Sequence, residues 1–203
     1  NSSCFGISYF RYNNLTTYYM KKLILLLFIF LFFEIPICSQ NFDLINPSKN
    51  IGTKNWSIVN DDVMGGISKS YVLINDSKRL IFKGYLSLEN NGGFASSRMD
   101  IRKKNLNGVK FFEIKFKGDG NSYKLRFRQE NMRVSYSCDF KSQKNEWTIV
   151  KLPVESFKAT WRGYTYSDYP ALNLDKINSL SLHISDKQQG EFNLEIEYIQ
   201  AIK

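Results

Sequence analysis

Two short polar loops carry the residues whose types and spacing could do chemistry. The first is residues 56–68, WSIVNDDVMGGIS, in which an apolar run ends in Asn60, Asp61 and Asp62 before a glycine pair. Asn and Asp accept hydrogen bonds from nearby backbone, and glycine tolerates positive φ, so the stretch predicts a strand that enters a tight loop. One of the carboxylates could ligate Ca²⁺ together with backbone carbonyls, but the alternating Asp pattern of a dedicated calcium loop is missing. We therefore expect no metal ion here.

The second loop is residues 90–98, NNGGFASSR, which is also polar and glycine-rich and ends in an arginine. We expect four glycines to shape the two loops: Gly65, Gly66, Gly92 and Gly93. Arg98 is expected to pair with Asp61 or Asp62, because a desolvated guanidinium needs a carboxylate. Phe94 and Met64 are expected to pack beside this pair. The two loops are thus predicted to be clamped together at one end of the fold.

A third group of polar residues lies on one side of the segment 123–128, YKLRFR. Aromatic rings and arginine forks on an open sheet face can bind sugars, acidic groups or a protein partner, although a solvated face is the alternative. The sequence therefore predicts a binding surface. Its candidate residues, together with those of the two loops, are Asn60, Asp61, Asp62, Arg98, Lys124, Arg126, Arg128, Trp161 and Arg162.

The sequence contains no complete catalytic constellation. His183 is the only histidine, and its place between Leu182 and Ile184 predicts an outward strand position. Cys138 follows the apolar side of an alternating run and is expected to be a buried small hydrophobic residue. One His and one such Cys cannot make a closed zinc site, and no phosphate loop or dinucleotide fingerprint is present. We expect a protein that is not an enzyme and binds no cofactor or metal.

The elements that must position these residues are strands. Alternating apolar and polar residues recur roughly every 8 to 15 residues after the first loop, and no convincing helical period is present. Turn residues such as the Gly118-Asp119-Gly120 stretch separate the runs. About ten short antiparallel strands without helices predict an all-β, two-sheet antiparallel jelly-roll sandwich. Residues 41–203 suffice for a single domain of this kind.

The first 40 residues are expected to lie outside this domain. Residues 20–40 combine a basic start, an apolar run and a short polar exit, which is typical of a secretory signal peptide. Lipidation of Cys38 is the alternative, but Ile37 is bulky for such a site. Residues 1–19 are interpreted as upstream read-through sequence. We therefore expect an exported protein, periplasmic or extracellular, with no transmembrane segment after signal removal.

The charge of the chain favours a solubilising surface over nucleic-acid binding. The formal net charge is +9, but the basic residues are spread along the whole length. The longest basic cluster is Arg102-Lys103-Lys104, and no arginine-rich arm is present. We expect a solubilising surface and no nucleic-acid binding.

The two loops and several later motifs together resemble one known family. The stretches WSIVNDDVMGGIS and NGGFASSR are similar to the signature of the complex I intermediate-associated protein family (the thirty-kilodalton assembly factor). Further matches follow in order at Gly118-Asp119-Gly120, Trp161-Arg162-Gly163 and Asp186-Lys187-Gln188, so that the resemblance covers nearly all of 43–202. The apolar leader differs from an arginine-rich mitochondrial transit peptide, which favours an exported bacterial member.

The resemblance implies a galactose-binding-like jelly roll with a non-catalytic role. Mitochondrial members of the family act as chaperones, or assembly factors, for respiratory complex I. We therefore expect a binding module that recognises a protein partner in the cell envelope, such as a subunit of a membrane complex. A carbohydrate-binding jelly-roll module is the alternative.

Overall fold

The structure is a computed structural model in which residues 18–22, 41–102 and 104–203 are described. The chain divides into two units, residues 1–38 and residues 39–203. In the first unit, residues 18–22 are helical. The expected upstream sequence and signal peptide lie outside the described residues except for this short segment, and Cys38 lies outside them too. None of the described helices has the length and apolar character needed to cross a membrane.

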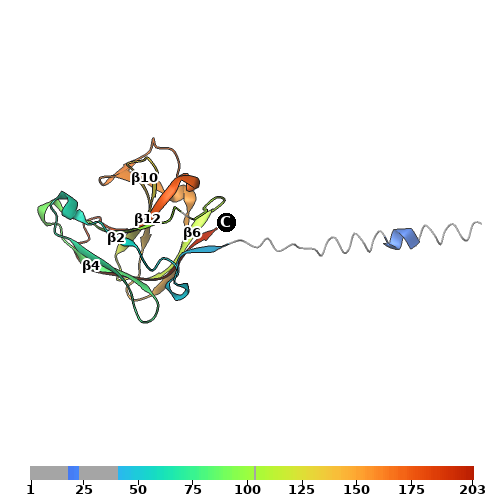
Figure 1. Cartoon of the computed structure of the whole chain (residues 1–203), viewed down its shortest axis with the longest axis horizontal. Coiled ribbons are helices and arrows are strands. Elements are labelled where there is room, and N and C mark those ends of the chain that lie inside the picture. Colours follow the sequence, from blue (N-terminus) through green and yellow to red (C-terminus); the bar gives the residue numbers. More distant parts are fainter. Residues whose placement is uncertain (1–17, 23–40, 103) are drawn as a thin grey trace, which may run out of the picture. The chain divides into compact units, whose positions relative to one another are not determined.

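The second unit is a sandwich of two antiparallel sheets (Figure 1). The six-stranded sheet has the order β3-β4-β13-β6-β9, with β1 also paired to β13. Its strands are β1 (Phe42–Ile45), β3 (Lys69–Ile74), β4 (Leu80–Leu86), β6 (Phe111–Lys117), β9 (Trp147–Pro153) and β13 (Gly190–Ile202).

The seven-stranded sheet has the order β11-β10-β8-β7-β12-β5-β2. Its strands are β2 (Trp56–Ile58), β5 (Ala95–Asp100), β7 (Ser122–Gln129), β8 (Ser135–Lys141), β10 (Lys158–Trp161), β11 (Tyr164–Tyr166) and β12 (Ile177–Ile184). The connections contain the 3₁₀ turns η1 (Pro47–Lys49), η2 (Asp61–Met64), η3 (Glu89–Asn91), η4 (Val154–Ser156) and η5 (Leu174–Lys176). The predicted all-β, two-sheet antiparallel fold is confirmed.

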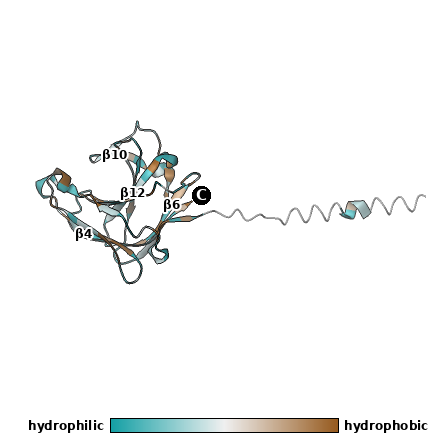
Figure 2. Cartoon of the chain, in the orientation of Figure 1, coloured by the Kyte–Doolittle hydropathy of each residue, from teal (hydrophilic) through white to brown (hydrophobic). Residues whose placement is uncertain are grey.

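The strands form where apolar and polar residues alternate, because successive side chains point to opposite faces of a sheet. In β7, Tyr123, Leu125 and Phe127 are buried, whereas the residues between them are only partly buried. Figure 2 shows hydrophobic and hydrophilic residues interspersed along the strands in this way. One face of each sheet is therefore apolar and packs into the hydrophobic core, and the other face is polar.

The core lies between the two sheets and is rich in aromatic rings. Phe112 of β6 and Phe127 of β7 have ring centroids 4.5 Å apart, and the rings of Phe116 and Phe140 are 4.9 Å apart. Burial of one such side chain stabilises the fold by about 1.5–3 kcal/mol. These contacts hold the seven-stranded sheet against the six-stranded one and leave its opposite face free to carry polar residues.

The two glycine-rich loops lie side by side at one end of the sandwich. The first contains η2 and follows β2, and the second contains η3 and precedes β5 (Figure 1). Val59 donates its backbone N–H to the carbonyl oxygen of Ser96, and Asp61 donates to that of Phe94. The chain around η2 therefore runs on beside β5 and brings the two loops together.

Candidate functional site

Asp61 joins the two glycine loops. Its carboxylate is fully buried and accepts hydrogen bonds from Ser68 N at 2.9 Å and Ser68 Oγ at 2.5 Å. It also accepts from the backbone N–H groups of Gly93 at 2.7 Å and Phe94 at 3.3 Å. Burial alone would raise the pKa of Asp61, but these hydrogen bonds to the charged form outweigh it and leave the pKa below its usual value. The two loops are thus joined, but through Asp61 and backbone N–H groups.

The glycines make room for this carboxylate. A Cβ atom on Gly66 would lie 2.4 Å from Cγ of Asp61, and one on Gly92 would lie 2.7 Å from its Oδ2. Gly65 and Gly93 instead have positive φ, +92° and +132°, which residues with a side chain rarely adopt. All four residues shape the loops as predicted.

The ion pair predicted between Arg98 and Asp61 or Asp62 is not formed. Asp61 is saturated by Ser68, Gly93 and Phe94, and Asp62 is exposed. Arg98 lies within β5, where its neighbours in register are Ser57 and Ser181. The prediction was wrong because the backbone N–H groups and the hydroxyl already satisfy the carboxylate, so that no arginine is needed.

Two further predictions for these loops need correction. Asn60 is buried, and its Oδ1 accepts from Ser70 Oγ at 2.6 Å and from Ser96 N at 3.4 Å, so its side chain links strands and is not presented to a partner. Met64 is 56% exposed, so it does not shield the loops from water as expected. Phe94 stacks on His183 with ring centroids 5.6 Å apart.

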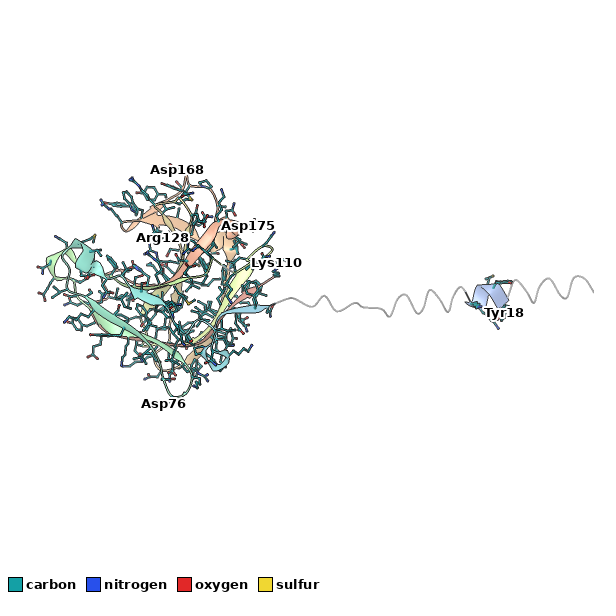
Figure 3. All side chains as sticks on the ribbon, in the orientation of Figure 1. Tyr18, Asp76, Lys110, Arg128, Asp168 and Asp175 are labelled. Carbon is teal, nitrogen blue, oxygen red and sulfur yellow. The ribbon has the colours of Figure 1, made fainter. Side chains whose placement is uncertain are left out.

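The outward face of the seven-stranded sheet gathers the basic residues, and we call it the polar face. β12 runs between β5 and β7, so that Ser181 has Arg98 on one side and Arg126 on the other. In the same way Ser179 lies opposite Arg128, and His183 lies opposite Lys124. Directly opposite residues of neighbouring strands share a face, so the three arginines, together with Asp100 opposite Ser179, surround two small serines. Arg128 is labelled in Figure 3.

The cations of the polar face differ in how they are neutralised. Lys124 forms ion pairs with Asp139 at 2.9 Å and with Asp186 at 2.7 Å, and Arg102 pairs with Asp100. Among the described residues, no carboxylate forms an ion pair with Arg98, Arg126 or Arg128. From the sequence, Lys124 was grouped with these arginines as a candidate binding residue. In the described structure Lys124 is ion-paired, whereas the three arginines are not.

Burial lowers the pKa of two of these three arginines. Desolvation, followed by the nearby charges of Arg98 and Arg128, lowers the pKa of Arg126 to about 10. Desolvation and then Arg128 also lower the pKa of Arg98. The Nε atoms of Arg98 and Arg126 are buried and have no hydrogen-bond partner, and the same is true of Ser137 Oγ, which faces Arg126 in register. Native proteins satisfy the large majority of such buried polar groups.

His183 contacts Arg126 on the polar face. It lies on the outward face, as predicted, but it is buried beneath Phe94. Arg126 Nη1 lies 3.2 Å from His183 Nδ1. Because a guanidinium can only donate, Nδ1 is the acceptor and the neutral ring carries its proton on Nε2. Burial, then the charges of Arg126 and Lys124, hold the pKa of His183 well below its usual value. Sequence reasoning missed this contact, and its only signal was the predicted outward position of His183.

Two hollows lie over the polar face. The first, the Arg98 hollow, has a volume of about 570 Å³ and is lined by Arg98, Arg128 and their neighbours. The second, the Arg126 hollow, has a volume of about 810 Å³ and extends from Arg126 to the glycine loops and to Arg162. Trp161 does not line either hollow; Arg162 stacks over its ring at 4.8 Å. The structure thus brings Arg162, but not Trp161, to this surface.

Exposed hydrophobic residues lie beside the Arg126 hollow. Met64 lines it directly, and the neighbouring Val63 is 68% exposed. Beyond Arg162 and Gly163, Tyr164 is 71% exposed. Hydrophobic side chains around a basic floor are the composition of a surface that binds another molecule.

Reactive groups are scarce in the same region. Cys138 lines the Arg126 hollow but is buried as predicted, and burial followed by the charge of Asp139 raises the pKa of its thiol to about 11. No group of three or more His, Cys, Asp or Glu side chains in the described residues is arranged to hold a metal ion. The geometry supports recognition of a ligand by charge and shape.

A two-sheet sandwich with a hollowed polar face defines a galactose-binding-like jelly-roll module. Residues 43–196 match the family described as complex I intermediate-associated protein 30, and the chain belongs to this family. The family resemblance seen in the glycine loops is confirmed.

Several relatives are similar along most of the domain. An uncharacterized protein of Schizosaccharomyces pombe is 29% identical over 181 residues, which cover 78% of this chain and 83% of the relative. The mitochondrial complex I intermediate-associated protein 30 of Mus musculus is 27% identical over 71% of this chain and 51% of its own length. A probable counterpart from Caenorhabditis elegans is 26% identical over 71% of this chain and 49% of its own length. The chain thus spans about half the length of the mouse and nematode relatives.

Solved structures share the fold at low identity. The family 11 carbohydrate-binding module of a cellulosomal cellulase from Clostridium thermocellum has a TM-score of 0.62 and 13% identity, covering 81% of this chain and 95% of the module. A domain of an agarase has a TM-score of 0.55 and 12% identity, covering 80% of this chain and 24% of the agarase. These likenesses establish the jelly-roll architecture alone.

Proposed function

We propose that this chain is a non-catalytic binding module that holds a protein partner during the assembly of a larger complex, as an assembly factor or chaperone does. The observation that carries the proposal is the polar face, where three uncompensated arginines lie beside exposed hydrophobic residues. Membership in the complex I intermediate-associated protein 30 family supports an assembly role. A subunit of a membrane complex, such as a complex I-related protein, fits this role.

The absence of catalysis is part of the proposal. His183 is held by Arg126 and Phe94, and the raised pKa of Cys138 disfavours a thiolate nucleophile. Binding without chemical turnover is what such a surface supports.

Carbohydrate binding is the second candidate function. The observation that favours it is the open hollow on one face of a jelly roll, in a fold shared with a family 11 carbohydrate-binding module. Against it, none of the three tryptophans lines either hollow over the polar face, although aromatic rings are the usual platforms for sugar rings.

The cellular location is proposed to be the cell envelope or the exterior. The support is the basic, then apolar character of residues 20–40. Intact mass of the protein purified from an envelope fraction tests this: removal of residues up to about position 40 is expected, and cytosolic protein that keeps Met20 would contradict it.

One paired experiment separates the two functions. Affinity capture from the native envelope is run with the parent chain and with Met64→Asp, which places a charge beside the Arg126 hollow; Lys83→Asp, on the exposed side of β4 in the other sheet, is the control. We expect stoichiometric capture of a protein that Met64→Asp loses and Lys83→Asp keeps. A saturable glycan on an array, with no protein captured, favours the second candidate, and hydrolysis of any glycan refutes both.

A further inference from the structure

We propose that Arg98, Arg126 and Arg128 form a binding site for the carboxylates of an acidic polypeptide segment. These three residues are called the arginine triad below. The proposal rests on the proposed function, because the segment belongs to the protein partner, and it adds the chemistry by which that partner is recognised.

The register of three strands brings the triad together. Arg98 and Arg126 lie on either side of Ser181, and Arg128 lies beside Ser179. Neighbouring strands are about 4.8 Å apart, so the Cα atoms of Arg98 and Arg126 are separated by roughly 10 Å across β12. The serines between them have short side chains, so the guanidinium groups can converge on one ligand above β12.

In the described part of the chain no member of the triad forms an ion pair, and Asp100, which faces Arg128 across Ser179, is paired with Arg102. Lys124 is held between Asp139 and Asp186 on the same face. The arginines instead lie near one another, and within the described residues none of them forms an ion pair with a carboxylate. Clustering of like charges is unfavourable in the free protein and is relieved when a negative charge arrives.

Buried donors that have no partner among the described residues point to an acceptor from a ligand. The Nε atoms of Arg98 and Arg126 and the Oγ atom of Ser137 are buried and unpaired. Arg126 is already fixed through Nη1 by His183, which leaves its Nε and remaining nitrogens to donate. A carboxylate accepts two parallel N–H bonds from a guanidinium, so one or two carboxylates would satisfy these donors.

The surroundings favour a polypeptide as the source of the carboxylates. The two hollows, about 570 Å³ and about 810 Å³, are far larger than a single small anion requires. Met64 lines the second hollow, and Val63 next to it is exposed. A hydrophobic rim beside charged anchors is typical of protein interfaces, where buried arginines are often the dominant contacts.

The test uses the full chain and two labelled peptides, hexaglutamate and hexaglutamine, in fluorescence anisotropy titrations at several salt concentrations. We expect hexaglutamate to bind and hexaglutamine not to bind, with affinity falling as salt rises. Arg98→Met, which removes no hydrogen bond seen in the structure, and Arg126→Met are each expected to weaken hexaglutamate binding by roughly tenfold or more. The control is Lys83→Met, an exposed residue of the other sheet with the same change in charge, which is expected to leave binding unchanged.

The outcomes separate the triad from the proposed function. Equal binding of the two peptides, or binding that survives both arginine substitutions, overturns the triad. Binding of oligogalacturonate by the parent chain without any binding of hexaglutamate also overturns it, because the carboxylates would then belong to a sugar. If the Arg98→Met and Arg126→Met variants capture the native partner as well as the parent does, the triad is not the site that binds the partner. The proposed function is then unaffected. If hexaglutamate binds through the triad but no protein partner is captured, the carboxylate site is supported and the proposed function is contradicted.

Discussion

Asp61 is fully buried and the arginines of the triad are partly buried, but the hydrogen bonding of the two charged groups differs. The carboxylate of Asp61 receives four hydrogen bonds from Ser68, Gly93 and Phe94. The triad has no ion pair in the described part of the chain, and two of its Nε atoms have no partner. A buried charge that is fully hydrogen-bonded within the protein stabilises the fold. A charge whose donors have no partner within the protein can bind a ligand. The comparison therefore links the glycine loops to stability and the polar face to the binding that we propose.

Replacing Asp61 is expected to have the largest effect. Asp61→Ala leaves the donors of Ser68, Gly93 and Phe94 buried without an acceptor, which should lower the free energy of unfolding by on the order of 3 kcal/mol. Asp62→Ala, at the exposed neighbouring position, is the control and should change it by less than about 0.5 kcal/mol. Urea denaturation measures both values. Similar losses in the two variants would show that Asp61 does not hold the loops.

Crowding the carboxylate is the next largest change. Gly66→Ala places Cβ 2.4 Å from Asp61 Cγ and should lower stability by about 1–3 kcal/mol. In an Asp61→Ala background the clashes with Cγ and Oδ1 disappear and only the one with Cβ, at 2.8 Å, remains. The added loss should therefore shrink, which a double-mutant cycle detects. Purely additive losses would mean that Gly66 is required for another reason.

Acidic pH should weaken the fold through His183. Its pKa is lowered in the folded protein by burial, Arg126 and Lys124, so that below the unfolded pKa of about 6.5 the unfolded chain binds a proton that the folded one does not. Stability is therefore complete above that pH and is lost as pH falls toward the folded pKa, by at most about 1.4 kcal/mol per unit. His183→Gln, which keeps an acceptor for Arg126, should flatten this slope between pH 7 and 5 in denaturation curves. An unchanged slope would assign it to other groups.

Removing a member of the triad is expected to have the smallest effect on stability. Unlike the changes above, it should raise the free energy of unfolding. Arg98→Met deletes an unpaired buried Nε and relieves repulsion with Arg128, so it should raise the free energy of unfolding by up to about 1 kcal/mol. Thermal melts check the sign, with Lys83→Met as the control. A clear loss of stability would indicate that Arg98 has a structural partner after all, and the contrast with Asp61 would then fail.

The alternation of residues made most of the fold predictable. Tyr123, Leu125 and Phe127 alternate with cations, and β7 has that pattern of burial. The glycine and Asx residues of the two loops likewise predicted tight turns, because φ preferences and short side-chain hydrogen bonds are properties of the local chain. For the same reason the family could be identified from the loops before any contact was known.

The partners of the charged residues could not be predicted in this way. Arg98 was expected to reach Asp61, but the donors that satisfy Asp61 are backbone N–H groups, whose direction depends on how the loop is folded. Lys124 and Arg126 are two residues apart on one strand face, yet one is ion-paired by Asp139 and Asp186 and the other is not. Side-chain pairing depends on which elements become neighbours, and a one-dimensional pattern does not contain this.

The sequence by itself therefore determined the sandwich, the tight glycine loops, the burial of Cys138 and the outward face that carries Arg126 and Arg128. Only the tertiary structure decided that β12 lies between β5 and β7, which places Arg98 and Arg126 on either side of Ser181. The physical reason is that alternation along a strand is local, whereas the order of strands in a sheet is fixed by how the whole chain buries its hydrophobic surface. The arginine triad is a product of that order.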